Sequence, residues 1–176
     1  MKKFKQIFLL ALMILPVLVA FSSANVYADD EEISLTDTQK SVIVDHCDTI
    51  KDSLKSLQKV DSRSRVYLGR YYETILSNFI TPLNLRLVEN NISNTKLLEN
   101  QTNFANKRNE FVNNFIVYQQ ALEELINVNC KSEPLRFYEK LKAAQEKRRV
   151  VNKDVTKLRS LTDEQKKLVE ELKNGQ

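Results

Sequence analysis

The chain has 176 residues, with 27 basic and 23 acidic side chains, one His, two Cys and no Trp. It holds only two Gly and three Pro, which disfavours a turn-rich β fold and favours long helices. One His and two distant Cys are too few for a structural zinc site, which usually takes four ligands. The composition therefore predicts a helical protein, and we expect no metal, no cofactor and no enzymatic activity.

The sequence opens with a short basic segment, residues 1–5, followed by the uncharged, mostly apolar run Ile7 to Phe21. As a helix this run is about 22 Å long, which is short for a hydrocarbon core of about 30 Å. A polar stretch ending Val26-Tyr27-Ala28 follows, which completes the layout of a secretory signal. We predict cleavage between Ala28 and Asp29 and hence an exported chain. The alternative is an uncleaved N-terminal segment that anchors the protein to the membrane.

Removal of residues 1–28 changes the charge argument, because Lys2, Lys3 and Lys5 leave with the signal and the formal net charge falls from +4 to +1. A nucleic-acid partner is therefore not expected, since such a partner needs a basic domain or stripe. Four acids begin the mature chain, so residues 29–36 are predicted to be a disordered acidic tail. Residues 37–173 are predicted to form a single helical-bundle domain.

A long first helix is predicted from Asp37 to Ile80. Thr36-x-x-Gln39 matches a capping box, and apolar residues then recur every seven positions, as in coiled coils. Thr81-Pro82 predicts a kink or a restart of the helix. The two heptad series, which Asp61 and Ser64 interrupt, are Ile43, Ile50, Leu57, Ser64 and Tyr71, and Cys47, Leu54, Asp61, Leu68 and Ile75.

Asn90 to Asn94 is the best loop in the chain, and a second helix is predicted from Thr95 to Asn129. A third helix begins near Pro134, and a second capping-box match, Thr162-x-x-Gln165, predicts a bend near Leu161 and a short fourth helix to Lys173. The fold class is thus an all-α, elongated, antiparallel three-helix bundle with coiled-coil-like packing, about 60 Å long. The stripe of the second helix is Leu97, Phe104, Phe111, Tyr118 and Leu125.

Cys47 and Cys130 most simply form one disulfide in an exported chain. An antiparallel hairpin that turns near residue 88 places them at the same height. A turn centred at Ile92 instead leaves Cys130 about 10 Å away from Cys47 along the axis. The alternative is that Cys47, which follows His46, is a reactive thiol.

A basic run lies in the third helix, and its members are Lys147, Arg148, Arg149, Lys153, Lys157 and Arg159. One interpretation is that it faces the acidic start of the first helix, since the third helix is expected to return beside the first. The other is that Lys147, Arg148, Arg149 and Lys153 bind an anionic envelope polymer or a membrane surface.

Arginines and tyrosines alternate between Asp61 and Glu73, and both types are common in binding hot spots. The candidate partner-binding residues are Arg63, Arg65, Tyr67, Arg70, Tyr71 and Tyr72. The structural alternative is local: Asp61 pairs with Arg65, and Gly69 makes room for a bulky neighbour such as Arg108 on the next helix.

The sequence contains several short motifs: Cys47-x-x-Ile50-x-x-x-Leu54, Asp61-x-Arg63-x-Arg65-Val66-x-Leu68-Gly69-x-Tyr71-Tyr72-Glu73, Pro82-Leu83-Asn84, Cys130 and Phe137-Tyr138. Together they resemble those of small exported helical proteins of ultra-small, host-dependent bacteria of the Saccharibacteria type. The likeness spans roughly residues 47 to 172, and it implies an exported, helical protein without an established activity.

The sequence thus favours a non-enzymatic interaction protein of the cell envelope or secreted space that binds a protein partner through a helix face. Two alternatives stay open: a binder of an anionic envelope polymer or membrane surface through the basic third helix, and an extracytoplasmic chaperone-like clamp. The oligomeric state is not predicted.

Overall fold

The computed structural model describes residues 34–92 and 94–174. The predicted signal peptide, its cleavage site at Ala28 and Asp29, and the acidic residues of the predicted tail lie outside the described residues. Over the described ranges the chain is helical and contains no strand, which confirms the all-α fold class. The elements are α1 (Asp37–Asp45), α2 (Cys47–Ile75), the π-helical turn η1 (Leu76–Ile80), α3 (Thr81–Glu89), α4 (Thr95–Asn127) and α5 (Pro134–Asn174).

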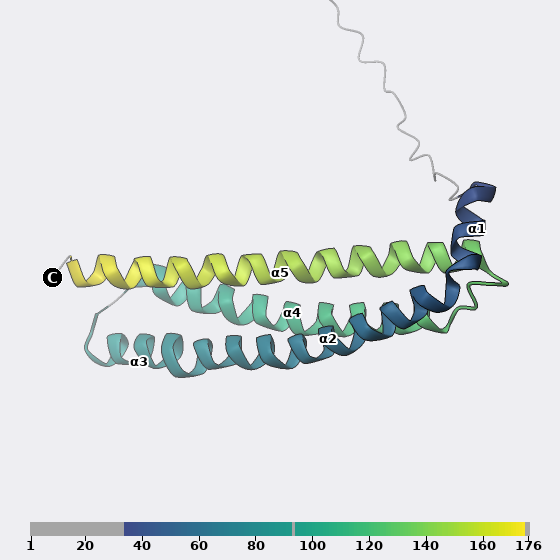
Figure 1. The fold of residues 1–176 in the computed structure, drawn as a ribbon. Helices are drawn as coiled ribbons and strands as arrows, with labels where there is room; N and C mark the ends of the chain where they lie inside the picture. The colour runs from purple at the N-terminus through teal and green to yellow at the C-terminus, as the bar shows by residue number, and fades with distance from the viewer. Residues whose placement is uncertain (1–33, 93, 175–176) are drawn as a thin grey trace, which may run out of the picture. The chain divides into compact units, whose positions relative to one another are not determined.

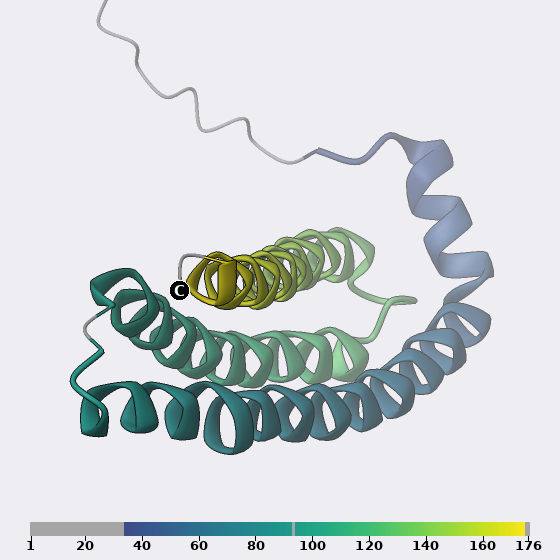
Figure 2. The ribbon, with the colours of Figure 1, turned by 90° about the vertical axis from the view of Figure 1, so that its left-hand side faces the viewer.

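The helices run antiparallel: α2 and α3 run in one direction, α4 returns, and α5 runs back along α4 (Figure 1). α4 packs on both α2 and α5 and lies between them (Figure 2). The sequence predicts that the third helix returns beside the first, and this holds in part: α5 lies against α1, but α4 separates it from α2, which α5 reaches through side chains such as Arg148. With 41 residues, α5 is about 60 Å long.

The apolar stripe of α4 forms the centre of the core, as its heptad spacing predicts. Tyr72 of α2 packs edge-to-face on Phe111, and the contact continues through Phe115 to Tyr118, with ring centroids 5.6–5.9 Å apart at each step. The stripe residues of α4 that are buried are Leu97, Phe104, Phe111, Tyr118 and Leu125.

The predicted first helix is not continuous, because it breaks at His46 (φ −103°, ψ 12°) between α1 and α2. The predicted capping box is present: Gln39 N donates to Thr36 Oγ1, and Thr36 N donates to Gln39 Oε1. α1 buries none of its residues, so no core packing holds it in line with α2. Leu35 is buried although it was placed in the predicted disordered tail, so the ordered unit begins before residue 37.

Pro82 is accommodated without a restart of the helix. Thr81 keeps helical dihedral angles (φ −63°, ψ −48°), and its N–H donates to the carbonyl of Leu76 across the π-helical turn. Proline lacks an N–H and crowds the carbonyl four residues earlier, so a wider turn just before it relieves both problems. The predicted kink near Pro82 is therefore a local π-helical turn.

α5 is a single helix, so the predicted bend near Leu161 and the short fourth helix are wrong. Thr162 Oγ1 donates to the carbonyl of Leu158 at 2.9 Å, which is the bond of a helix-interior threonine rather than of an N-cap. Leu161 and Leu168 are both buried, and this packing carries the helix through the capping-box match.

Candidate functional site

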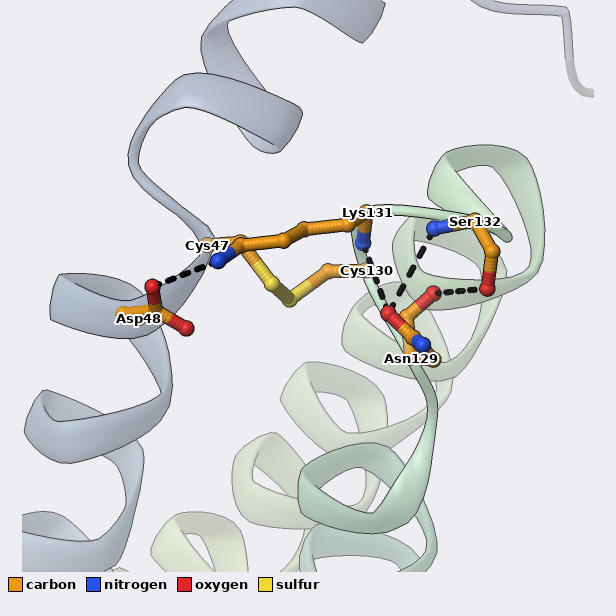
Figure 3. The surroundings of a disulfide bond; sticks show 6 residues. All are labelled: Cys47, Asp48, Asn129, Cys130, Lys131 and Ser132. Atoms are coloured by element: carbon orange, nitrogen blue, oxygen red, sulfur yellow. Dashed lines mark hydrogen bonds and ion pairs between the residues drawn. A yellow bond between two sulfur atoms is a disulfide. The ribbon is translucent and has the colours of Figure 1, made fainter.

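The predicted disulfide between Cys47 and Cys130 is present, with the two Cα atoms 5.6 Å apart. Both residues are buried, and no cysteine is free. The alternative of a reactive Cys47 thiol is therefore wrong in this structure. The bond joins the start of α2 to the turn between α4 and α5 (Figure 3).

The turn that carries Cys130 is built by Asn129, whose Oδ1 accepts hydrogen bonds from the N–H groups of Lys131 (3.1 Å) and Ser132 (3.4 Å). Lys131 Nζ crosses to Asp48 Oδ2 on α2 at 2.7 Å (Figure 3). The hydrogen bond from Lys131 lowers the pKa of Asp48. The polar groups around the disulfide thus bond to one another, and the disulfide acts as a structural crosslink.

Asp61 is buried at a heptad position and links all three long helices. Its Oδ2 accepts a hydrogen bond from Tyr118 Oη of α4 at 2.7 Å, and Arg148 of α5 lies 3.4 Å from Oδ1. Burial first, and then the hydrogen bond to Asp61, raises the pKa of Tyr118. The predicted pair of Asp61 with Arg65 is therefore wrong, because partners on other helices take its place.

The predicted role of Gly69 is also wrong. A Cβ atom added at Gly69 meets no atom within 4 Å, so no bulky neighbour comes close enough to require a glycine at this position. Arg108, the neighbour expected there, pairs instead with Glu73.

An exposed aromatic face, defined here as Arg63, Val66, Tyr67, Arg70 and Tyr71, lies on the outward side of α2. Tyr67 and Tyr71 are 70% and 48% exposed, and their rings stack with centroids 6.4 Å apart. Arg63, Val66, Tyr67 and Arg70 line a shallow groove together with Ser62. Arg63 and Arg70 are exposed, and neither forms an ion pair with any described residue.

Two of the candidate partner-binding residues do not belong to this face. Tyr72 is only 1% exposed and packs in the core, and Arg65 is half-buried. Asp61 and Tyr72 are both buried and stand 11 residues apart, which is three helical turns rather than a heptad step. This change from a heptad to an 11-residue spacing places Tyr72 in the core and Tyr71 on the surface. The feature of the sequence that could have indicated it is Asp61, a polar residue at a heptad position.

The four predicted polyanion-binding residues of α5 have different surroundings. Arg148 pairs with Asp61, as an orientation toward the acidic helix predicts, and Arg149 pairs with Glu146 of its own helix at 2.6 Å. Lys147 and Lys153 are exposed and have no carboxylate partner among the described side chains. Of these four residues, only Arg148 therefore pairs with a carboxylate of the predicted first helix.

A shallow groove runs along the outward side of α5, and the sequence-predicted set includes only part of it. We name it the α5 groove, and its lining residues are Arg149, Asn152, Lys153, Thr156, Lys157 and Ser160. Lys157 belongs to the basic run of the sequence, whereas the residues that were missed, Asn152, Thr156 and Ser160, are uncharged, so a search for basic residues does not find them. The signal that identifies them is the four-residue spacing that places side chains on one side of a helix.

Comparisons with protein-family models, curated proteins and solved structures found no match. The resemblance to exported helical proteins of Saccharibacteria-type bacteria stays a prediction. Among the described residues, no His, Cys, Asp and Glu side chains cluster in a way that suits a metal ion. None of the helices described is both long and apolar enough to cross a bilayer.

Proposed function

We propose that this chain is an exported, non-enzymatic interaction protein that binds a protein partner through the aromatic face of α2. The observation that carries the proposal is the stacked pair Tyr67 and Tyr71, which points away from the core although the next residue, Tyr72, is buried in it. Single exposed apolar side chains are common on protein surfaces, whereas contiguous groups of them mark interaction sites.

The composition of the face defines the kind of partner. Tyrosine supplies a large, rigid contact area together with a hydroxyl, and arginine adds a planar donor group, so both are frequent in binding hot spots. Arg63 and Arg70 flank the tyrosines, and no described carboxylate neutralises them. A partner segment that presents apolar side chains beside acidic ones is complementary to this face.

The face has a rigid support. Tyr72 packs against Phe104 and Phe111 directly beneath it, and Asp61 ties the same stretch of α2 to Tyr118 of α4. Little ordering is therefore needed on binding, which favours affinity. Because the inward side chains of α4 are already buried, we do not favour the chaperone-like clamp.

Export rests on two supports. The first 28 residues have the layout of a secretory signal, and disulfides persist mainly in oxidising, extracytoplasmic compartments. The Cys47–Cys130 bond is compatible with such a location. Under this proposal the partner is another envelope or secreted protein.

The proposal is tested by a photo-reactive phenylalanine analogue at position 66 of the full-length protein, expressed in its native cells and irradiated at the cell surface. We expect one discrete protein adduct, with the crosslink in a segment that carries acidic and apolar side chains. The adduct should disappear in the Tyr67→Ala/Tyr71→Ala background and weaken strongly with Arg63→Glu/Arg70→Glu.

The matched control places the same photo-reactive residue at Val88 of α3, which is apolar and 57% exposed but lies outside the aromatic face. No adduct at position 66, the same adduct from position 88, or an adduct that persists in the tyrosine double variant each contradicts the proposal. Circular dichroism and thermal unfolding confirm that both variants keep the parent fold, since exposed substitutions usually change stability by less than about 0.5 kcal/mol.

A further inference from the structure

We propose that the α5 groove binds a linear polyanion that carries repeated phosphate-like groups, at a site separate from the aromatic face of α2. The groove lies between two parallel rows of side chains on one helix. One row holds the bases Arg149, Lys153 and Lys157, and the other holds the uncharged Asn152, Thr156 and Ser160. Within each row the step is four residues, or about 6 Å along the axis.

None of the side chains that line the groove is a carboxylate, and each carries a hydrogen-bond donor, of which the Thr156 hydroxyl donates to the carbonyl of Asn152. Lys153 and Lys157 are exposed and have no ion-pair partner in residues 34–92 and 94–174. Arg149 sits at one end and shares its guanidinium with Glu146, through two bonds of 2.6 and 2.7 Å. Lys153 also lowers the pKa of Glu146, after the larger effects of Arg149, so the field of the groove reaches this carboxylate.

The remaining acid of this stretch of α5 does not compete for the groove. Asp154 is buried and faces α4, where its Oδ2 accepts a hydrogen bond from Asn114 at 2.7 Å and its Oδ1 lies 3.4 Å from Lys107. Lys153 and Lys157 therefore keep their charge for a ligand from outside, and Arg149 adds the N–H groups of Nη1, which Glu146 does not bind. A ligand with regularly spaced negative charges contacts all three bases at once.

A polymer fits this site better than a membrane surface or a nucleic acid. Peripheral membrane helices add exposed apolar side chains to their bases, whereas the exposed large apolar residues described for α5 comprise only Leu135, far from the groove. Proteins that hold single-stranded nucleic acids usually add aromatic rings on which bases stack, and no aromatic residue lines this groove. The groove therefore offers only charged and polar contacts, which suit the charged backbone of a polymer.

The test measures the binding of long-chain inorganic polyphosphate to the full, oxidised protein by fluorescence anisotropy from 50 to 200 mM salt. Three contacts predict a slope of about −2 for log K against log salt, a loss of about twentyfold over this range. The Lys153→Glu/Lys157→Glu variant should bind more weakly at 50 mM salt and show a slope shallower than about −1.

Lys166→Glu/Lys173→Glu is the matched control, because both lysines are exposed on the same helix outside the groove and the net charge changes equally. It should keep the slope of the parent, as should Tyr67→Ala/Tyr71→Ala, whose face is separate. Equal losses of polyphosphate affinity in the two lysine variants would show that only the net charge matters, and would contradict a binding site in the groove. Tighter binding to phosphatidylglycerol vesicles or to single-stranded oligo-dT than to polyphosphate, at equal phosphate, would also overturn it.

Discussion

The two ends of the helical unit are held together by different interactions, a disulfide at one end and buried amide side chains at the other. At one end, the Cys47–Cys130 disulfide joins α2 covalently to the turn before α5, and the Lys131–Asp48 ion pair lies beside it (Figure 3). At the other end, α3 meets the start of α4, and the start of α4 packs against the last turns of α5, without a disulfide (Figure 1).

Buried amide side chains hold the second end. Asn84 Nδ2 donates to the carbonyl of Leu97 at 3.1 Å, and Asn100 Nδ2 donates to that of Leu161 at 3.2 Å. The Oδ1 atoms of both asparagines, and both amide atoms of Gln165, are buried without a hydrogen-bond partner among the described groups. Each such amide group carries a desolvation cost of about 1–3 kcal/mol.

The comparison shows how stability is distributed along the bundle. A crosslink stabilises an end by restricting the unfolded chain, whereas amides stabilise it only as far as their hydrogen bonds are complete. We therefore expect the amide end to open first in hydrogen exchange and the disulfide end to open last, and the aromatic face and the α5 groove lie between them.

Removal of the disulfide should have the largest effect. The bond closes a loop of 83 residues, for which the chain-entropy model gives about 4.5 kcal/mol of stabilisation. Cys47→Ala/Cys130→Ala should therefore lose about that much free energy of unfolding, measured in urea. Exchange of the first amides of α2 should accelerate until the disulfide end opens as readily as the amide end.

The Asp48→Ala variant is the control for this change, because it removes the neighbouring exposed ion pair and keeps the disulfide. Exposed pairs contribute about 0–1 kcal/mol, so its free energy of unfolding should stay near that of the parent. A disulfide-free protein of parental stability, or one whose amide end still opens first, would contradict this view of the two ends.

Loss of Asp61 should have an intermediate effect, midway between the ends. Asp61→Ala leaves the buried Tyr118 hydroxyl without its acceptor, which costs about 1–3 kcal/mol. Replacement of both partners by apolar groups, in Asp61→Leu/Tyr118→Phe, should recover most of the loss. Urea unfolding of Asp61→Leu, Tyr118→Phe and Asp61→Leu/Tyr118→Phe forms a double-mutant cycle, and strictly additive losses would show that the two side chains are not coupled.

Alkaline pH examines the same hydrogen bond in the unmodified protein. Burial and Asp61 raise the pKa of Tyr118 above its ordinary value of 10.0. A group whose pKa is raised by folding stabilises the protein fully below its unfolded pKa, and this contribution is lost progressively as pH rises from the unfolded value through the folded value. The parent should therefore lose more stability than Tyr118→Phe between pH 9 and 11, whereas Tyr72, whose pKa burial also raises, remains in both.

Much of the fold could be predicted because the heptad pattern of α4 is uninterrupted, and each of its stripe residues is buried. The disulfide was predicted from topology, but the offset of about 10 Å was not resolved. α4 ends at Asn127, two residues before the predicted end, and Val128 is extended (φ −68°, ψ 138°). An extended residue advances about 3.3 Å rather than 1.5 Å, so Val128 recovers about 2 Å of the offset.

The candidate surfaces were harder to predict, since they depend on which way single residues turn. Tyr71 and Tyr72 are adjacent and chemically identical, and only the 11-residue step from Asp61 decides that Tyr72 enters the core. Local capping patterns had the same limit: Thr36 caps a helix, whereas Thr162 lies inside one because Leu161 and Leu168 hold it in the packed core. Tertiary packing thus overrides local signals wherever the two disagree.

The smallest effect is expected at the amide end, and it should be a gain. Gln165 is buried, and neither atom of its amide group has a hydrogen-bond partner among the residues described, so Gln165→Leu removes a desolvation cost without removing a bond. We expect the free energy of unfolding to rise by about 1 kcal/mol and the exchange of nearby α5 amides to slow.

Gln145→Leu provides the control, because Gln145 is exposed on the same helix and the same substitution there relieves no buried group. Equal stability changes in the two variants would trace the gain to the helix propensity of leucine. A loss of stability in Gln165→Leu would show that the amide is needed, and the amide end would then be held more firmly than its unpaired atoms indicate.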